Sequence, residues 1–484
     1  MPLCQTESSA PLHFQEVSYS YESMTSPLLA QVSFHCGTGW TGVVGANGAG
    51  KTTLLKLAIR ELIPVAGVVQ GGEDFLWCPQ PTDMVPPIFD TFLEADENRA
   101  YAIRSRLGIE GDWIERWETL SHGERKRAQI AILLWLDPPG LAIDEPTNHI
   151  DSEARQLLAD ALMQFRGVGL LVSHDRELLD RLCYQCLFLD PPDLKIRPGG
   201  FSSGMELESA DRERTQAEYK QAAEELSRLE QAASQHRQVA ARSHLLRSKR
   251  GLAIKDHDSR FRRNLARLSG RDGASGRQLD RLEGRIRQAL ARKDSIVMKK
   301  SHRLGMDVPG ERCRRNLLFH MEAGEYFVGR DRVVRHPALA LKPGDRVAIT
   351  GPNGSGKTTL IQRIIASLGF DKARFGQERL GRIMTIISLL GSRPERLLES
   401  RQPSPGEVRK LLLALGMERD PYLIVADEPT NHLDLPSILC LEAALKETPC
   451  GLLLVSHDRG FLDKLSDRRW NIRPDKAGGV LELS

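Results

Sequence analysis

The chain has 484 residues, of which 40% are hydrophobic and 27% are charged, and its formal net charge is +3. This composition is that of a globular protein with room for two domains of about 180 residues and a segment between them. It excludes a chain that crosses a membrane, because no apolar run approaches the roughly 18 residues that a membrane helix needs. The start of the sequence lacks the pattern of a signal peptide. The eight cysteines are scattered and do not resemble a disulfide framework, so we expect a cytoplasmic protein.

One set of motifs occurs twice along the chain, in the same order. Each copy holds a glycine-rich loop that ends in G-K-T, then S-x-G-E, then D-E-P-T-N-H-x-D, then S-H-D. Ser121 precedes Asp144 by 23 residues, and Ser404 precedes Asp427 by 23 residues. Such self-similarity indicates a tandem duplication. We therefore divide the chain into a first domain, a linker and a second domain: 1–207, 208–312 and 313–484.

Apolar strands lead into the motifs of each copy. Strands are expected over 41–44, 141–143 and 169–172, with a helix over 51–60, and over 346–349, 423–426 and 452–455 in the second copy. Strands that alternate with helices predict an α/β fold with a parallel sheet covered by helices in each domain. The interval from the loop lysine to S-x-G-E is 70 residues in the first copy and 47 in the second. We therefore expect a trimmed helical region in the second domain.

The loop G-x-x-x-x-G-K-T, placed between a strand and a helix, predicts a phosphate-binding site for ATP. Its glycines let backbone N–H groups face the phosphates, and its lysine reaches the outer phosphates. The loop residues expected to bind the nucleotide are Gly45, Asn47, Gly48, Gly50, Lys51, Thr52 and Thr53 in the first copy, and Gly351, Asn353, Gly354, Gly356, Lys357, Thr358 and Thr359 in the second.

The acidic motif adds the groups that hydrolysis needs. Asp144 and Asp427 end apolar strands, where a carboxylate can hold Mg²⁺ together with the hydroxyl of Thr52 or Thr358. Each is followed by a glutamate, Glu145 or Glu428, that can polarise the attacking water. A further strand in each copy ends at a histidine, His174 or His457, that can contact the γ-phosphate. A lone histidine is more often structural, but its recurrence at the same interval favours a catalytic role.

This order of motifs resembles the ATP-binding cassette superfamily. Two cassettes in one chain, the D-E-P-T-N-H-x-D string and a charged helical linker resemble its ABC-F branch, whose members are ATPases that act on the translating ribosome. The resemblance covers about residues 12–484. It implies a chain that pairs its own two cassettes as a monomer and binds two Mg-ATP between them. Each ATP would contact the phosphate loop of one cassette and the S-x-G-E signature of the other.

The resemblance also implies a set of residues for each site. Site one would join Lys51, Asp144, Glu145 and His174 to Ser404 and Gly406, and site two would join Lys357, Asp427, Glu428 and His457 to Ser121 and Gly123. Gln80 and Gln377 would sense the Mg²⁺. Tyr21 would stack on the first adenine, although a plain surface tyrosine is the alternative, and Tyr326 is the candidate aromatic for the second. The second signature departs from the family pattern with Pro403 and Pro405, so we expect the two sites to turn over differently.

The linker is predicted to form an antiparallel helical hairpin. Apolar residues recur at spacings of three and four, which is typical of a narrow packing seam. They are Tyr219, Ala222, Leu226, Leu229 and Ala233 in the first helix, and Leu279, Leu282, Ile286 and Ala289 in the second. Gly270, Gly273 and Gly276 are expected to interrupt helicity between the helices. A solvated spacer is the alternative, but a spacer needs no apolar seam.

The middle of the chain is strongly basic. Residues 211–300 hold 23 Lys/Arg against 12 Asp/Glu, and 241–270 alone carry a net charge of +7. Clustered arginines suit RNA phosphates. The residues expected to contact rRNA and tRNA are Arg247, Lys249, Arg250, Arg260, Arg262, Arg263 and Arg267. A solvated charged loop is the alternative.

Three functions are compatible with the motifs. The first is a ribosome-binding ATPase, either a translation factor or an antibiotic-resistance protein that protects the ribosome. The second is the ATP-hydrolysing subunit of a membrane transporter, which leaves the basic linker unexplained. The third is an ATPase of DNA repair or chromosome organisation, which usually has zinc modules or far longer coiled coils. Cys183 and Cys186 form a lone C-x-x-C, which we interpret as buried core cysteines, with a metal or redox pair as the alternative.

Overall fold

The computed structural model describes residues 11–22, 27–148, 150–247, 271–296, 316–329, 332–368, 386–387, 405–417, 421–475 and 478–484. The chain divides into two compact units. One unit comprises Met1–Gly204 with His302–Ser484 and holds both motif repeats, and the other comprises Met205–Ser301.

The first repeat is built on a six-stranded sheet of order β5-β6-β7-β3-β8-β9. Its strands are parallel except at β9, and a separate antiparallel sheet has the order β2-β1-β4. The strands are β1 (Leu12–Tyr19), β2 (Leu29–Cys36), β3 (Gly39–Gly45), β4 (Ala66–Gln70), β5 (Phe75–Cys78), β6 (Gly140–Asp144), β7 (Val168–Val172), β8 (Cys183–Asp190) and β9 (Asp193–Pro198). The helices are α1 (Lys51–Ala58), α2 (Phe89–Glu94), α3 (Asn98–Leu107), the 3₁₀ turn η1 (Trp117–Thr119), α4 (His122–Leu136), α5 (Ser152–Leu162) and α6 (Arg176–Leu182).

The second repeat has a seven-stranded sheet of order β11-β12-β18-β17-β14-β16-β15. Its strands are β11 (Gly324–Val328), β12 (Arg332–His336), β14 (Arg346–Thr350), β15 (Leu423–Asp427), β16 (Gly451–Val455), β17 (Arg468–Asp475) and β18 (Gly478–Leu483), and β10 (Phe319–Met321) pairs with β13 (Leu339–Leu341) apart from it. The helices are α10 (Lys357–Leu368), α13 (Pro405–Met417), α14 (Leu435–Glu447) and α15 (Arg459–Leu465). The predicted parallel strands are confirmed in both repeats, and the antiparallel strands at the edges were not predicted.

The central strands are apolar because they are covered on both faces of the sheet. All residues of β6, β7 and β16 are buried, which is why these segments read as short continuous apolar runs without alternation. Cys183 and Cys186 lie buried in β8 as free thiols, so the interpretation as core cysteines is confirmed.

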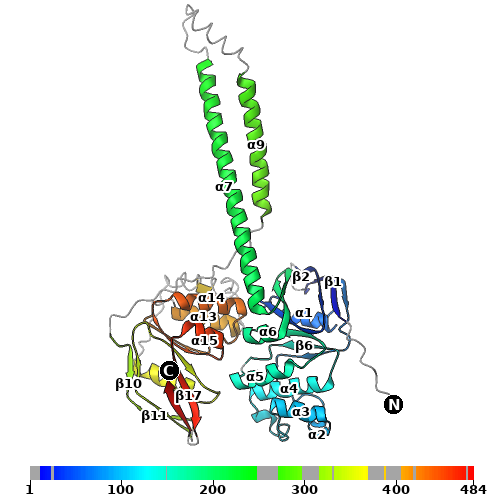
Figure 1. The fold of residues 1–484 in the computed structure, drawn as a ribbon, viewed down its shortest axis with the longest axis vertical. Coiled ribbons are helices and arrows are strands. Elements are labelled where there is room, and N and C mark those ends of the chain that lie inside the picture. Colours follow the sequence, from blue (N-terminus) through cyan, green and yellow to red (C-terminus); the bar gives the residue numbers. More distant parts are fainter. Residues whose placement is uncertain are drawn as a thin grey trace, which may run out of the picture. The chain divides into compact units, whose positions relative to one another are not determined.

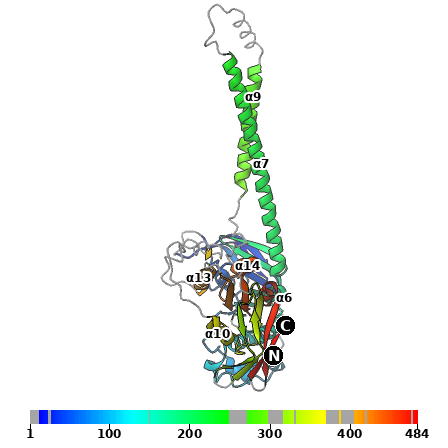
Figure 2. The same ribbon diagram turned by 90° about the vertical axis from the view of Figure 1, so that its left-hand side faces the viewer.

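The linker helices α7 (Phe201–Arg247) and α9 (Arg271–Ser295) lie side by side in Figure 1 and Figure 2. Leu226, Leu229 and Ala289 form a small buried core between them. The helices are antiparallel, because Glu225 pairs with Arg292 whereas the later Arg237 pairs with the earlier Glu283. The predicted hairpin is therefore confirmed. Gly273 and Gly276 lie within α9, so the prediction that they interrupt helicity is wrong. No helix of the described residues is both long enough and apolar enough to cross a membrane.

The two repeats fill one position of the sheet with different pairs of residues. In the first repeat, Trp40 of β3 pairs in register with Gly169 of β7, and in the second repeat Arg346 of β14 pairs with Leu452 of β16. Trp40 is buried, and a Cβ on Gly169 would lie 2.3 Å from its ring. The small residue therefore makes room for the large one.

We predict that Gly169→Val destabilises the first repeat by about 1–3 kcal/mol, because the added side chain overpacks the indole ring. The measurement is the midpoint of the first thermal unfolding transition, which should fall. Gly284→Ala in α9 is the control, since a Cβ there meets nothing within 4 Å. A midpoint that is equal in both variants would show that Trp40 moves aside without cost.

Candidate functional site

The two glycine-rich loops share a backbone shape that requires glycine. Gly50 has a φ of 95° and Gly356 a φ of 98°, which is the left-handed region. A Cβ on Gly50 would lie 2.8 Å from Leu28 Cδ2, and one on Gly356 would lie 2.5 Å from Val328 Cγ2. Each loop opens a helix, α1 or α10, whose first N–H groups have no partner within the helix and can face an anion.

The loop lysines fold back over their own loops. Lys51 Nζ donates to the Gly45 carbonyl at 2.9 Å, and Lys357 Nζ donates to the Gly351 carbonyl at 2.8 Å. Burial lowers the pKa of both amines, although acidic neighbours partly oppose it. Both cations therefore lie beside the space that each loop encloses.

A threonine and an aspartate meet at the end of each loop. Thr52 Oγ1 donates to Asp144 Oδ2 at 2.7 Å, and Thr358 Oγ1 donates to Asp427 Oδ2 at 2.7 Å. Burial raises the pKa of Asp144. No group of three or more acidic, histidine or cysteine side chains within the described ranges could hold a metal alone. Mg²⁺ bound together with phosphates and waters needs only one or two carboxylates, so the oxygen donors present fit Mg-ATP.

A glutamate and a histidine are paired at the same place in each repeat. His174 Nε2 lies 3.0 Å from Glu145 Oε1, and His457 Nε2 lies 3.4 Å from Glu428 Oε1. The glutamates have φ values of 49° and 47°, a backbone conformation that residues other than glycine rarely adopt. Each glutamate N–H is held by the last carbonyl of the neighbouring strand, β7 or β16. The same strained conformation in both repeats is the kind of outlier that gathers at functional sites.

The two pairs differ in their electrostatics. Burial raises the pKa of the Glu145 carboxyl, but the charge and hydrogen bonds of His174, together with the Lys51 ammonium, outweigh burial and hold this pKa below its usual range. Burial also raises the pKa of Glu428, and there the His457 N–H and Lys357 offset only part of the effect. The carboxylate is therefore held more firmly in its ionised form at Glu145 than at Glu428.

A cavity of about 560 Å³ joins the first loop to the second repeat. Its volume lies within the range of small-molecule sites. The Asn47 N–H donates to Asp434 Oδ2 at 2.7 Å, and a Cβ on Gly406 would lie 3.2 Å from Asn47 Nδ2. The residues expected at site one that line this cavity are Tyr21, Asn47, Gly48, Gly50, Lys51, Thr52, Thr53, Gln80, Asp144, Glu145, His174 and Gly406.

The residues expected at site two show fewer contacts between the two repeats than those of site one. Asp151 of the first repeat lies near enough to Lys357 for its charge to oppose the lowering of the lysine pKa. Ser121 caps α4 in a capping box with Glu124, and Gly123 follows in the first turn. Among the described residues, no hydrogen bond joins Ser121 or Gly123 to the second loop.

Several predicted residues lie outside the described part of the chain. They are Ser404, Gln377, Lys249, Arg250, Arg260, Arg262, Arg263 and Arg267, while Arg247 is described only as the last residue of α7.

The two candidate adenine-stacking tyrosines have different surroundings. Tyr21 is 40% exposed, and its hydroxyl lies 2.9 Å from Thr53 Oγ1 at the edge of the cavity. Tyr326 is only 1% exposed, and its hydroxyl donates to the Gly356 carbonyl. A ring enclosed in the core has no free face for a base, so the interpretation of Tyr326 as an adenine-stacking residue is wrong.

One residue near the site was missed by the sequence analysis. Lys126 of α4 is fully buried, and its Nζ donates to the carbonyls of Pro79 at 2.5 Å and Gln80 at 3.3 Å. Gln129, one turn later, donates to the Pro81 carbonyl at 3.0 Å. The signature helix α4 therefore holds the loop that carries Gln80. The signal in the sequence is weak, because a lysine in a polar helix start is usually exposed.

The comparisons with known proteins agree with this geometry. The sequence model of the ABC transporter family matches residues 29–148 and 334–372. The chain is 28% identical over 466 residues to the ribosome protection protein VmlR of Bacillus subtilis, covering 88% of this chain and 80% of that protein. It is 28% identical over 570 residues to the tylosin resistance ATP-binding protein TlrC of Streptomyces fradiae, covering 98% and 100%. The chain belongs to the ABC-F branch of the ATP-binding cassette superfamily.

The fold of this ABC-F chain is also found among solved structures. The crystal structure of the complex of archaeal ribosomal stalk protein aP1 and archaeal ribosome recycling factor aABCE1 aligns with a TM-score of 0.60 at 18% identity, covering 96% of this chain and 89% of that chain. The two chains therefore share a fold over most of their length. As an ABC-F protein the chain is an ATPase, and the two repeats are its cassettes.

We predict that Lys126→Met destabilises the first cassette by about 1–3 kcal/mol, because the carbonyls of Pro79 and Gln80 lose their buried donor. Thermal unfolding should show a lower first midpoint. The exposed Lys446→Met in α14 is the control and should leave the midpoint unchanged. Equal midpoints for the two variants would contradict the clamping role of Lys126.

Proposed function

We propose that this ABC-F protein hydrolyses two Mg-ATP at sites between its cassettes and acts on the ribosome. The observation that carries the proposal is the cavity in which Lys51, Glu145 and His174 of one cassette face Gly406 of the other. Because these contacts form within one chain, they support a monomer that pairs its own cassettes. The domain limits that we propose are 1–207, 208–312 and 313–484.

The phosphates would be bound by the glycine-rich loops. In this proposal Lys51 and Lys357 exchange their contacts with loop carbonyls for the outer phosphates, a strong charge-assisted interaction. Thr52 with Asp144, and Thr358 with Asp427, would hold the Mg²⁺. When bound, that ion neutralises phosphate charge. Gln80 lines the same cavity, as expected of a residue that senses the metal, and Tyr21 at the cavity edge would stack on the first adenine.

The paired glutamates and histidines would perform the hydrolytic step. Glu145 and Glu428 would accept the proton of the attacking water as general bases. His174 and His457 each contact the neighbouring glutamate through both the backbone N–H and Nε2, which fixes the carboxylate. The imidazoles would also contact the γ-phosphate. The different pKa values of Glu145 and Glu428 support unequal turnover at the two sites.

We predict that the double variant Glu145→Gln, Glu428→Gln binds ATP but hydrolyses it at least about a hundredfold more slowly, because a glutamine amide cannot accept the proton. Single-turnover kinetics with radiolabelled ATP measure this rate. Glu94→Gln with Glu447→Gln is the control, because it removes one exposed carboxylate from each cassette at a distance from the motifs. A double variant that hydrolyses ATP at the normal rate would refute the general-base roles.

Two observations support the ribosome as the partner. One relative of similar length is named a ribosome protection protein, and the linker concentrates positive charge in residues 241–270. Phosphate-rich RNA rewards such clustering because bound counterions are released. We propose that Arg247, Lys249, Arg250, Arg260, Arg262, Arg263 and Arg267 contact rRNA or tRNA.

We predict that replacing Arg260, Arg262, Arg263 and Arg267 with Gln weakens ribosome association and flattens its salt dependence, by a slope of about 0.7–0.9 for each lost phosphate contact. The ATPase rate without ribosomes should stay unchanged, since no cassette motif is altered. Ribosome pelleting across a salt series is the measurement.

The control for this variant removes the same charge from the exposed faces of α7 and α9. It replaces Arg212, Arg214, Arg285 and Arg287 with Gln. An equal loss of binding in both variants would mean that net charge alone attracts the ribosome. An unchanged salt slope in the first variant would return residues 241–270 to the interpretation as a solvated loop.

A further inference from the structure

The two cassettes fill equivalent positions of their interface with different residues. On one side, Arg176 Nη1 lies 2.8 Å from Glu442 Oε2, and both side chains are largely buried. Counted from the S-H-D and D-E-P-T-N-H-x-D motifs, the residues at the same places on the other side are Arg459 and Ala159. An alanine methyl cannot pair with a guanidinium, so this ion pair occurs on one side only.

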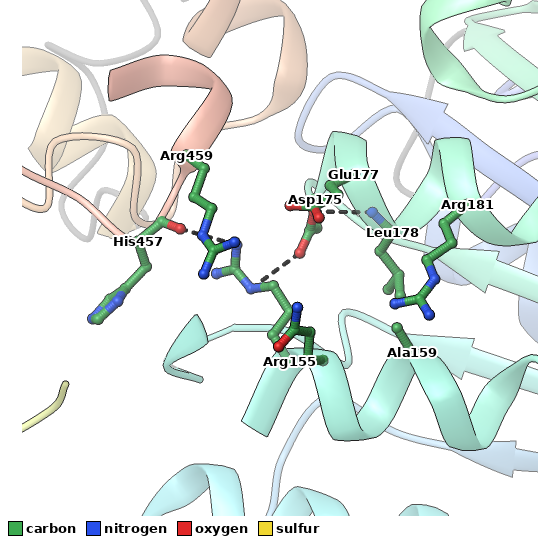
Figure 3. A pocket seen from close by; sticks show the side chains of 9 residues that line it. Arg155, Ala159, Asp175, Glu177, Leu178, Arg181, His457 and Arg459 are labelled. Atoms are coloured by element: carbon green, nitrogen blue, oxygen red, sulfur yellow. Dashed lines mark hydrogen bonds and ion pairs between the residues drawn. The ribbon is translucent and has the colours of Figure 1, made fainter. Parts of the chain in front are cut away.

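On the second side, Arg155 reaches across the interface, as Figure 3 shows. Its Nε lies 3.1 Å from Asp175 Oδ2 of the same cassette, and its Nη1 donates to the carbonyl of His457 of the other cassette at 3.2 Å. Counted from the same motif, the equivalent residue of the second cassette is Ile438, which is buried in the core. An isoleucine side chain donates no hydrogen bond, so this contact also occurs on one side only.

Asp175 anchors Arg155 without depending on it. The carboxylate of Asp175 caps α6 by accepting from the Leu178 N–H at 3.1 Å, and its own N–H donates to Ser173 Oγ at 3.0 Å. Only 6% of the Asp175 side chain is exposed. Loss of Arg155 would therefore leave Asp175 in place, whereas the His457 carbonyl would lose a donor that comes from the opposite cassette.

The cavity beside Arg155 is not a second nucleotide site. At about 20 Å³ it has room for about one water molecule. Two further arginines line it, of which Arg181 pairs with Asp160, and Arg459 makes no hydrogen bond or ion pair with any residue that the structure describes. What distinguishes this place is therefore the contact that Arg155 makes across the interface, and not a bound ligand.

We propose that Arg155 is a positioning residue of site two that the first cassette supplies. By fixing the carbonyl of His457, it fixes the imidazole beside Glu428, and the planar guanidinium fork suits two such contacts at once. Site one has no equivalent arginine, because Ile438 takes the corresponding position. The two sites therefore differ in the residues that position the histidine. The inference rests on the proposed roles of His457 and Glu428.

The electrostatics of site two support this placement. Burial, the Lys357 ammonium and the Arg155 guanidinium, in that order of importance, lower the pKa of His457 to about 4. The first cassette thus acts on this histidine both through a hydrogen bond to its carbonyl and through the field at its ring.

The test measures each site alone. Glu145→Gln leaves site two as the working site, and Glu428→Gln leaves site one. In the first background, we expect Arg155→Gln to lower kcat about fivefold or more while KM for ATP changes less than about twofold, because a misplaced group beside the attacking water affects the transition state more than binding. In the second background, kcat should stay within about twofold of its value without the change.

Arg181→Gln is the matched control, since it removes an arginine from the same cavity that pairs only within the first cassette. Arg155→Lys keeps the positive charge but loses the planar guanidinium group. Its rate at site two should therefore lie between those of Arg155→Gln and the unchanged protein. It also serves as the test variant if thermal unfolding shows that Arg155→Gln is not folded. Equal losses at both sites, or none at site two, would overturn the proposal. If neither glutamate variant slows hydrolysis at all, the proposed function fails first and this inference fails with it.

Discussion

The geometry of the protein depends on three parallel strands that end at one edge of each sheet. In the first cassette β3 pairs with β7 and β7 with β6, and in the second β14 pairs with β16 and β16 with β15. The phosphate loop follows the first strand of each trio, the histidine follows the second, and the acidic pair ends the third. Register between buried strands therefore sets the distances between groups that lie as far apart in sequence as Lys51 and His174.

The strained glutamates show how tightly this edge is built. Each takes a left-handed conformation at the point where its strand ends, and each is held there by the last carbonyl of the neighbouring strand. A carboxylate turned in this way meets the histidine of the next strand instead of solvent. The strained conformation persists because the backbone hydrogen bond to the neighbouring strand holds each glutamate on one side, and the contact with the histidine holds its carboxylate on the other.

Much of this arrangement could be predicted from the sequence. The strands before Lys51, Asp144 and His174 are short apolar runs next to motifs of known spacing, and the hairpin seam at Leu226 and Leu229 follows helical periodicity. These features depend on local patterns that repeat along the chain. They are therefore visible without knowledge of how distant segments meet.

The features that were missed depend on packing between distant segments. Gly273 and Gly276 are helical although Asp272, Ser275 and the glycines themselves have low helix propensity, so the local sequence does not reveal where α9 begins. The burial of Tyr326 is decided by strands that come later in the chain. The sequence around Lys126 does not reveal that Pro79 and Gln80 will offer it two carbonyls. The local sequence around Arg155 indicates an ordinary exposed arginine. Its contact with the His457 carbonyl becomes visible only when the two cassettes are paired.

The different residue pairs at this one position of the two sheets have an evolutionary consequence. Trp40 needs Gly169, and Arg346 lies opposite Leu452, yet the members of each pair are separated by more than a hundred residues of sequence. A recombination event that copied one strand from the second half of the gene into the first would bring the indole against a leucine. A strand copied in this way would overpack the core of the first cassette, so the two halves of the gene cannot exchange this strand without a loss of stability.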